Sequence, residues 1–213
     1  MNRLTLPHAT KEDLYQTLTT IHLGSDPLLF KALQQAESSH ESQRRDDGNN
    51  YLTQHIYPVA IEVIHYYQTK SGEERLRPET IAGALLHDVL EDDENMSDTK
   101  FREKFGEEVY RLVKPLSKPD YRTYRGASKR DQKIAMNLEY RKIIQLAPHE
   151  SKIIKFADRY KNICSVHASP KPGKIEDYIR DTEEFYLPLA KEECVYFYER
   201  IKARIEILKE NIA

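Results

Sequence analysis

The chain has 213 residues, enough for one sizeable hydrophobic core, and we expect a single domain over residues 1–213. Lysine and arginine number 33 and aspartate and glutamate 35, so no global field draws the protein to nucleic acid or an anionic membrane, and we expect neither partner. No apolar run could span a bilayer, and the N-terminus lacks a signal peptide. The only cysteines, Cys164 and Cys194, lie far apart, which favours a reduced, cytoplasmic protein.

Helical signals fill the first part of the chain. Asp26 can cap a helix that has Pro27 at its first position. Apolar residues then recur at spacings of three and four, which places His40 at the end of the core-facing stripe. A turn-rich segment follows, and a second helix is expected to begin near Pro58, with His55 just ahead of its start.

The segment PETIAGALLHDVLEDD, residues 78–93, predicts one continuous helix. Each helical residue advances about 100°, so one sector carries two stacked polar rows. The four polar residues of these rows are His87, Asp88, Glu91 and Asp92. One turn earlier the same rows carry Gly83 and Ala84, whose small side chains are expected to leave open space beside the polar groups. A space lined by such groups indicates a site of chemistry.

The second half of the chain is also helical. Gly106 is expected to close one helix, and the basic, proline-broken residues 114–131 are expected to form a long loop. Two more helices are expected over residues 132–148 and 150–166, and a long C-terminal stretch is interrupted at Pro188. Because no stretch alternates with a period of two, the predicted fold class is all-α, a helical bundle.

An adjacent His87 and Asp88 can bind one divalent cation only if other residues complete the ligand shell. His55 offers a second imidazole and Asp158 a second carboxylate. Alone, a histidine near a helix start is more often a core or capping group, and an aspartate followed by arginine is more often a surface ion pair. The combination favours a metal site. The helix of Asp158 also carries a polar strip in an otherwise apolar pattern, formed by Lys155, Asn162 and Ser165.

Several blocks of sequence occur in the order found in a known enzyme family. They are HESQRR (40–45), YLTQHIYPVA (51–60), HDVLEDD (87–93), FGEEVYRLV (105–113), LAPHESKIIKFADRYKN (146–162) and RDTEEFYLPLA (180–190). Together they resemble the HD superfamily of metal-dependent phosphohydrolases, in the form of the RelA/SpoT-type alarmone hydrolases, and most closely the small stand-alone ones. We expect a motif core over about residues 26–190, followed by a C-terminal helical extension.

The resemblance implies a fold, an activity and roles for individual residues. It implies an all-α HD domain that hydrolyses the 3′-pyrophosphate of guanosine tetra- or pentaphosphate, giving GDP or GTP and pyrophosphate. It implies one Mn²⁺ held by His55, His87, Asp88 and Asp158. Glu91 and Asp92 match the family's catalytic acidic pair. Arg45, Asn162 and Ser165 match positions that contact the nucleotide substrate.

Two other basic residues are candidates for phosphate contacts. Arg44 directly follows the predicted helix that ends at His40, and Lys155 lies on the polar strip. Some positions depart from the family pattern: Asp46 stands where a second basic residue usually follows Arg45, the proline that usually follows the first metal histidine is displaced to Pro58, and Asp93 replaces a common threonine. The change at Asp46 removes a phosphate partner and adds repulsion toward a polyanion.

The departure at Asp46 keeps other functions open. One is hydrolysis of a different nucleotide, for example removal of the 2′-phosphate from NADPH. Another is nucleotide binding without turnover, although the intact Glu91 and Asp92 argue against it. A helical scaffold with no site would leave the polar rows of the motif helix unexplained.

Overall fold

The computed structural model describes residues 5–70 and 75–212 of the chain. Within these residues there is no β-strand, only an isolated bridge between Arg44 and Asn50. The α-helices are α1 (Lys11–Thr20), α2 (Pro27–His40), α3 (Tyr57–Gln68), α4 (Pro78–Leu85), α5 (Val89–Asp92), α6 (Asp98–Val113), α7 (Lys129–Leu146), α8 (His149–Ser165), α9 (Lys174–Asp181), α10 (Leu187–Glu193) and α11 (Val195–Ile212). The all-α prediction is confirmed.

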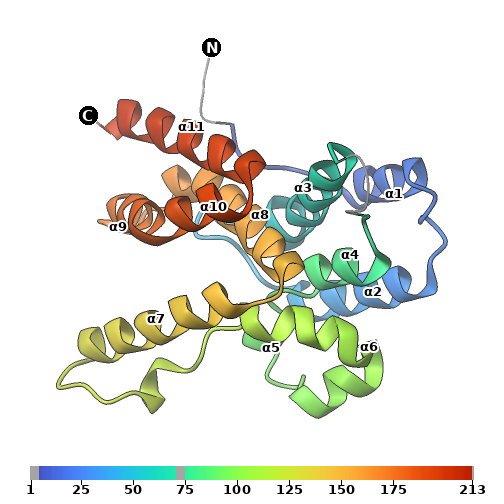
Figure 1. Cartoon of the computed structure of the whole chain (residues 1–213), viewed down its shortest axis with the longest axis horizontal. Coiled ribbons are helices and arrows are strands. Elements are labelled where there is room, and N and C mark those ends of the chain that lie inside the picture. The colour runs from blue at the N-terminus through green and yellow to red at the C-terminus, as the bar shows by residue number, and fades with distance from the viewer. Residues whose placement is uncertain (1–4, 71–74, 213) are drawn as a thin grey trace.

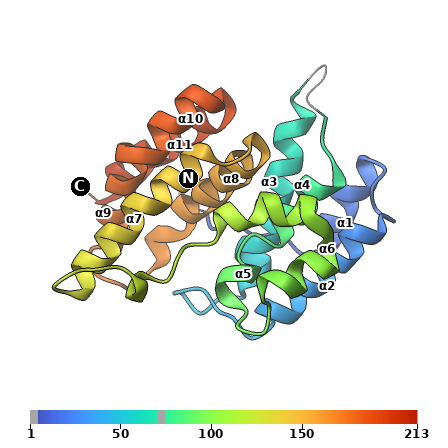
Figure 2. The same ribbon diagram turned by 60° about the horizontal axis from the view of Figure 1, so that its bottom comes forward.

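Helix α8 forms the centre of the molecule. Every residue from Ser151 to Arg159 is buried. Helices α3 and α4 pack on one side of α8 and helices α10 and α11 on the other (Figure 1). Figure 2 shows α7 and the loop before it at the periphery. A central helix covered this thoroughly can hold polar groups only where they are paired, which limits where a site can lie on it.

The predicted helix signals at α2 and α6 are confirmed. Asp26 accepts hydrogen bonds from the amides of Leu28 and Leu29 at 2.9 and 3.1 Å, and Pro27 begins α2. Gly106 divides α6 into two parts, because its φ of 86° lies outside the helical region. This φ favours a residue without a side chain. None of the helices in the described ranges has the length and apolar content that crossing a membrane requires.

His55 lies inside a helix and not ahead of one. It belongs to a π-helical turn, η1 (Leu52–Ile56), that runs directly into α3. The cause is Pro58, which has no N–H to donate and whose ring crowds the carbonyl four residues back. A wider turn relieves this crowding, and the Tyr57 N–H donates to the Leu52 carbonyl five residues earlier. The proline thereby sets the position of His55.

A π-helical turn before a proline also occurs near the C-terminus. A second π-helical turn, η5 (Thr182–Tyr186), precedes Pro188 and lets the chain continue into α10. Pro188 therefore interrupts the regular α-helix through a π-helical turn, as predicted, but it does not end the helical path. The helical path ends instead at Cys194, whose extended backbone (φ −159°, ψ 91°) separates α10 from α11.

The predicted continuous helix over residues 78–93 is wrong. Helix α4 ends at Leu85 and α5 begins at Val89, with a turn between them. His87 explains the break, because its imidazole Nδ1 donates to the carbonyl of Ala84 at 2.8 Å. A continuous helix would use that carbonyl for a backbone amide four residues later.

The space beside Gly83 is filled. A Cβ atom at this position would lie 3.1 Å from Cδ1 of Ile154 on α8. The glycine therefore allows α4 and α8 to pack closely, and the expectation that it leaves open space beside the polar rows is wrong. The close contact brings the end of α4 against the polar part of α8.

Candidate functional site

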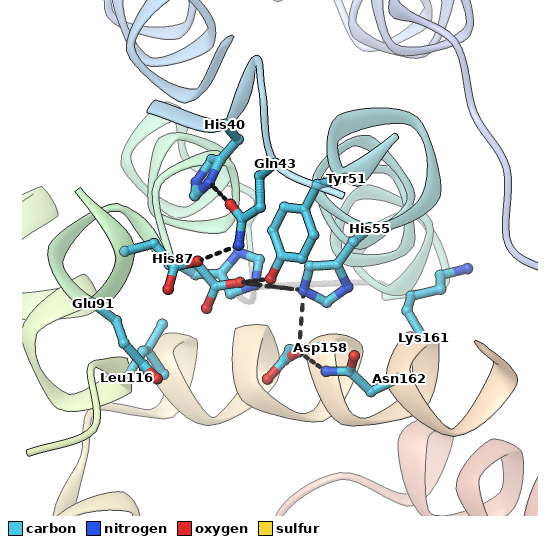
Figure 3. A network of polar contacts seen from close by, with 12 residues as sticks. His40, Gln43, Tyr51, His55, His87, Glu91, Leu116, Asp158, Lys161 and Asn162 are labelled. Carbon is cyan, nitrogen blue, oxygen red and sulfur yellow. Dashed lines mark hydrogen bonds and ion pairs between the residues drawn. The ribbon is translucent and has the colours of Figure 1, made fainter. Parts of the chain in front are cut away.

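Histidine and aspartate side chains from three elements converge between α4, η1 and α8 (Figure 3). One ligand atom from each of His55, His87 and Asp88 lies within 4.8 Å of the others. The Nε2 atoms of His55 and His87 are 3.2 Å apart, and Oδ2 of Asp88 lies 3.4 Å from the first and 3.2 Å from the second. Asp158 adjoins this group, with its Oδ1 3.4 Å from Nε2 of His55. We call these four residues the His/Asp cluster.

The spacing of His55, His87 and Asp88 fits ligands of a single metal ion. Nitrogen and oxygen ligands about 2.0 to 2.2 Å from one ion lie roughly 3.0 to 3.5 Å from one another at tetrahedral or octahedral angles. The three separations among His55, His87 and Asp88, between 3.2 and 3.4 Å, fall in this range, and so does the 3.4 Å between Asp158 and His55. Asp158 is not part of the group whose ligand atoms all lie within 4.8 Å of one another. Two imidazoles and two carboxylates are also donors that Mn²⁺, Fe²⁺ and Zn²⁺ accept.

Local contacts orient the two imidazoles. The carbonyl of Ala84 can only accept a hydrogen bond, so Nδ1 of His87 carries a proton and Nε2 is the atom that faces His55 and Asp88. The His55 ring lies between the rings of Tyr51 and His87, with centroids 5.0 and 5.1 Å away. Burial lowers the pKa of His55. Burial also opposes protonation of His87, but the adjacent charge of Asp88 raises its pKa to about 9.

Both carboxylates of the His/Asp cluster are held by further side chains. The Tyr51 hydroxyl donates to Oδ2 of Asp88 at 2.6 Å. Lys155 Nζ donates to Oδ2 of Asp158 at 2.7 Å, and the Asn162 amide donates to Oδ1. Although burial opposes it, the charge of Lys155 lowers the pKa of Asp158 to about 2. Both carboxyl groups are therefore ionised at neutral pH, as metal ligands must be.

Lys155 lies deeper than the sequence suggested. Its side chain is 10% exposed, pairs with Asp158 and stands 5.5 Å from the ring of Tyr140. The structure therefore pairs this lysine with a carboxylate of the His/Asp cluster, Asp158.

Glu91 and Asp92 lie one turn beyond the His/Asp cluster and keep contact with solvent. The backbone amide of Lys118 donates to Oε2 of Glu91 at 3.0 Å, and the Gln43 amide donates to Oδ2 of Asp92 at 2.9 Å. Partial desolvation and the charge of Asp88 raise the pKa of both carboxyl groups. A raised pKa suits a carboxylate that takes up and returns protons.

A second recess opens next to the His/Asp cluster. We call it the cationic pocket; it is lined by Gln43, Arg44, Arg45, Asp46, Asp47, Tyr51, Ser165, Val166, Ala168, Ser169 and Lys174. The Arg45 guanidinium donates to Oδ1 of Asn162 at 3.0 Å and to the Ser165 hydroxyl at 2.6 Å. Asn162 also donates to Asp158, so it links the pocket to the His/Asp cluster. The structure thus brings Arg45, Asn162 and Ser165 together.

Sequence reasoning assigned no role to three residues that the site contains. Tyr51 stands one helical turn before His55, a spacing that could have marked it as a neighbour on the same face. Gln43 accepts a hydrogen bond from His40 Nδ1 at 2.5 Å and donates one to Asp92, so it links these two residues. No local sequence pattern predicts this link. Lys174 lines the cationic pocket and forms an ion pair with Asp46, from which it is separated by 128 positions in the sequence.

Comparison with known families gives the class of the protein. Residues 32–195 match the model of the HD domain, so the chain belongs to the HD domain family. HD domains are metal-dependent, and His55, His87 and Asp88 form a group that could hold a metal ion.

Known relatives of the chain point to one group within the HD domain family. The bifunctional (p)ppGpp synthase/hydrolase SpoT of Escherichia coli (strain K12) is 34% identical over 84% of this chain, which corresponds to 24% of that protein. The guanosine-3′,5′-bis(diphosphate) 3′-pyrophosphohydrolase of Vibrio cholerae is 35% identical over 73% of this chain and 20% of its own length. The chain thus spans between a fifth and a quarter of the length of these relatives. The resemblance to SpoT-type hydrolases that the motifs predicted is confirmed.

A solved structure shares the fold. It is described as "A metazoan ortholog of SpoT hydrolyzes ppGpp and plays a role in starvation responses". It superposes with a TM-score of 0.66 at 18% identity, over 85% of this chain and 95% of that one. The correspondence covers nearly all of the smaller protein, so the two share one helical architecture.

Proposed function

We propose that this protein hydrolyses the 3′-pyrophosphate of guanosine tetra- or pentaphosphate, releasing pyrophosphate and GDP or GTP. The observation that carries the proposal is the adjacency of two features: donor atoms of His55, His87 and Asp88 within 4.8 Å, and a pocket in which Arg45 bonds Asn162 and Ser165. The first suits a metal-dependent hydrolase, and the second offers cationic and polar groups to a phosphorylated nucleotide. Names of relatives at 34 and 35% identity support the substrate.

The ion that the His/Asp cluster holds is proposed to be one Mn²⁺ per chain. His55, His87, Asp88 and Asp158 would supply two nitrogen and two oxygen donors. The first three lie between 3.2 and 3.4 Å from one another, and Asp158 lies 3.4 Å from His55. When bound, such an ion lowers the pKa of a water molecule and offsets charge on phosphoryl oxygens. A donor set of mixed nitrogen and oxygen is suited to Mn²⁺.

Residues of this chain supply the proton chemistry. Hydrolysis forms a bond between the water oxygen and the phosphorus atom bonded to O3′, breaks the bond between that phosphorus and O3′, and returns a proton to O3′. Glu91 has a raised pKa and a carboxylate fixed by the Lys118 amide, so it is suited to accept the proton of the attacking water. Asp92, held by Gln43, is suited to donate or position a proton at the leaving side.

The cationic pocket is proposed to hold the nucleotide. Arg45 is fixed by Asn162 and Ser165, and a guanidinium oriented in advance loses little freedom when it binds a phosphate. Arg44 lies at the opening and is exposed, with its guanidinium bonded to the carbonyls of Glu41 and Gln43. Arg44 therefore serves as a solvent-side cation.

The extent and location of the protein belong to the same proposal. Helix α11, beyond the motif core, packs on α8 and α10, which supports one domain over residues 1–213. Arg204 of α11 donates to the carbonyl of Cys164 on α8 at 3.0 Å. The thiols of Cys164 and Cys194 are free and buried, which supports a cytoplasmic location.

A substrate comparison tests the proposal. Purified protein with Mn²⁺ is incubated with guanosine tetraphosphate and, separately, with NADPH. We expect pyrophosphate and GDP in equal amounts from the first and no inorganic phosphate from the second. Phosphate release from NADPH without pyrophosphate release from guanosine tetraphosphate would replace this function by a 2′-phosphatase. Binding of either nucleotide without product would indicate a binding protein.

A further inference from the structure

The carboxylate of Asp46 accepts hydrogen bonds from three donors, two in the segment that joins α8 to α9 and one at the start of α9. The Ser169 hydroxyl donates to Oδ2 at 2.6 Å, Lys171 Nζ donates to Oδ1 at 2.6 Å, and Lys174 Nζ donates to Oδ2. These hydrogen bonds, that of Lys171 foremost, lower the pKa of Asp46, so the carboxylate stays charged at neutral pH. Asp46 thus fixes one edge of the cationic pocket.

The backbone of the turn directs Asp46 toward this segment. The Gly48 amide donates to the Arg45 carbonyl at 2.9 Å, and the Arg45 amide donates to the Asn49 carbonyl at 2.9 Å. Gly48 has a φ of 82°, which closes the turn tightly. Consecutive side chains therefore reach different partners: Arg45 binds α8, and Asp46 binds the segment that follows it.

The two lysines bound to Asp46 differ in their surroundings. Lys174 lines the cationic pocket, and its side chain is 29% exposed. Lys171 is absent from the pocket lining, and its side chain is 65% exposed. Both ammonium groups bind the same carboxylate, so the pair offers one cation inside the pocket and a matched cation outside it.

Lys174 decides the charge of the cationic pocket. The other charged residues of the lining are Arg44, Arg45, Asp46 and Asp47, whose charges cancel. The ammonium of Lys174 makes the lining net positive, which favours a polyanionic ligand. An ion pair exposed on an ordinary surface would contribute little to stability, so its position in the pocket is the informative feature.

We propose that Lys174, held in position by Asp46, binds a phosphate of the nucleotide and helps to determine substrate specificity. It supplies from α9 the second cation that the family resemblance places at position 46. The inference rests on the proposed function and names the residue that completes the same pocket. A lysine already held at the pocket edge loses less conformational freedom on binding than one free in solvent.

Binding measurements with matched variants test the role of Lys174. The probes are guanosine tetraphosphate and, separately, inorganic pyrophosphate, with EDTA present so that no metal-dependent turnover occurs. We expect Lys174→Gln to weaken the binding of guanosine tetraphosphate about tenfold or more, since a hydrogen bond to a charged group is lost. Lys171→Gln should weaken it less than about twofold, and Lys174→Arg, which keeps the charge, less than about threefold.

The outcomes separate this inference from the proposed function. Equal weakening by Lys174→Gln and Lys171→Gln, or no weakening by either, would overturn the role of Lys174. Failure of the wild-type protein to bind either probe would overturn it as well. If the variants follow the expected order but wild-type protein with Mn²⁺ releases no pyrophosphate, the role of Lys174 stands and the proposed function fails.

An exchange of charges tests the claim that Lys174 replaces a cation at position 46. The double variant Asp46→Lys with Lys174→Asp keeps the ion pair and the net charge of the pocket. We expect it to bind guanosine tetraphosphate within about threefold of wild type, whereas Lys174→Asp alone weakens binding by more than about tenfold. A double variant as weak as Lys174→Asp alone would contradict the replacement.

Discussion

The His/Asp cluster and the cationic pocket adjoin each other, yet they are built in different ways. His55 and His87 are 1% and 2% exposed, and packed helices fix their positions. The pocket is walled by a turn and a connecting segment that ion pairs hold together, and Arg44 is exposed. Tyr51 belongs to both regions, since it lines the pocket and donates to Asp88.

Because of this difference, the His/Asp cluster indicates the type of reaction, whereas the cationic pocket indicates the substrate. The packing of α4, η1 and α8 leaves the cluster little freedom, so its residue types and distances indicate the reaction. A cation of the pocket can come from either wall, as Lys174 illustrates, so the substrate must be read from the assembled pocket. Variants that affect one region and spare the other test this separation.

The largest effect is expected from Asp88→Ala in the His/Asp cluster. This change removes a carboxylate that lies 3.2 Å from His87 and 3.4 Å from His55, and so removes a ligand atom. We expect pyrophosphate release to fall to background and bound metal to be lost, with helicity retained. Metal content by mass spectrometry and circular dichroism provide the readouts. Full activity in this variant would show that the metal site is elsewhere.

Glu91→Gln is expected to separate metal binding from proton transfer. The variant keeps the shape of the side chain but cannot accept a proton, so we expect turnover to fall roughly 10²- to 10⁴-fold with metal content unchanged. Glu94→Gln, an equivalent change at a nearby exposed residue, is the matched control and should retain activity. Loss of metal in Glu91→Gln would make Glu91 part of the ligand set.

Tyr51→Phe tests the residue that both regions share. Removing the hydroxyl deprives Asp88 of a hydrogen bond of 2.6 Å, and we expect metal affinity or activity to fall about 10- to 100-fold. The control is Tyr57→Phe, which deletes a similar bond of 2.9 Å to Glu37 away from the cluster. Equal effects on metal affinity in the two variants would mean that Tyr51 does not orient Asp88.

The pH dependence of kcat/KM should follow the titration of Glu91, beside the His/Asp cluster, and not that of Asp46, at the edge of the cationic pocket. The pKa of Glu91 is raised by partial desolvation and by Asp88, so its base form is present at high pH and is lost as pH falls. We expect kcat/KM to decline on an acidic limb above the usual glutamate value of about 4.3. Asp46, with a lowered pKa, stays ionised over that range.

Rate profiles of two variants check this assignment. Lys174→Gln should keep the acidic limb, and the residual activity of Glu91→Gln should lack it. An acidic limb that persists in Glu91→Gln would assign the titration to a different group.

The sequence predicted most of the helices from local patterns, and it predicted the residues of the His/Asp cluster from their combination and from the family resemblance. Asp26 and Pro27 start α2 as expected, and the motif residues around His87 and Asp158 meet across packed helices. The break after α4 was missed because His87 takes the Ala84 carbonyl through its side chain, which helical periodicity does not reveal. The π-helical turn around His55 was also missed, because it is caused by Pro58, which lies three residues further along the chain.

The cationic pocket was harder to predict. Arg45, Asn162 and Ser165 were named through the family resemblance, and the structure brings them together. The pairing of Asp46 with Lys174 spans 128 residues in a chain with 33 lysines and arginines. No local pattern selects one of those cations, because the choice depends on how α9 packs near the turn.

Metal removal and return is the most direct test of the central claim, that the His/Asp cluster holds the ion on which hydrolysis depends. Protein stripped with EDTA and freed of chelator is titrated with Mn²⁺ while pyrophosphate release from guanosine tetraphosphate is followed. We predict no turnover without metal and recovery that saturates at one Mn²⁺ per chain. Undiminished turnover by the metal-free protein would contradict the account.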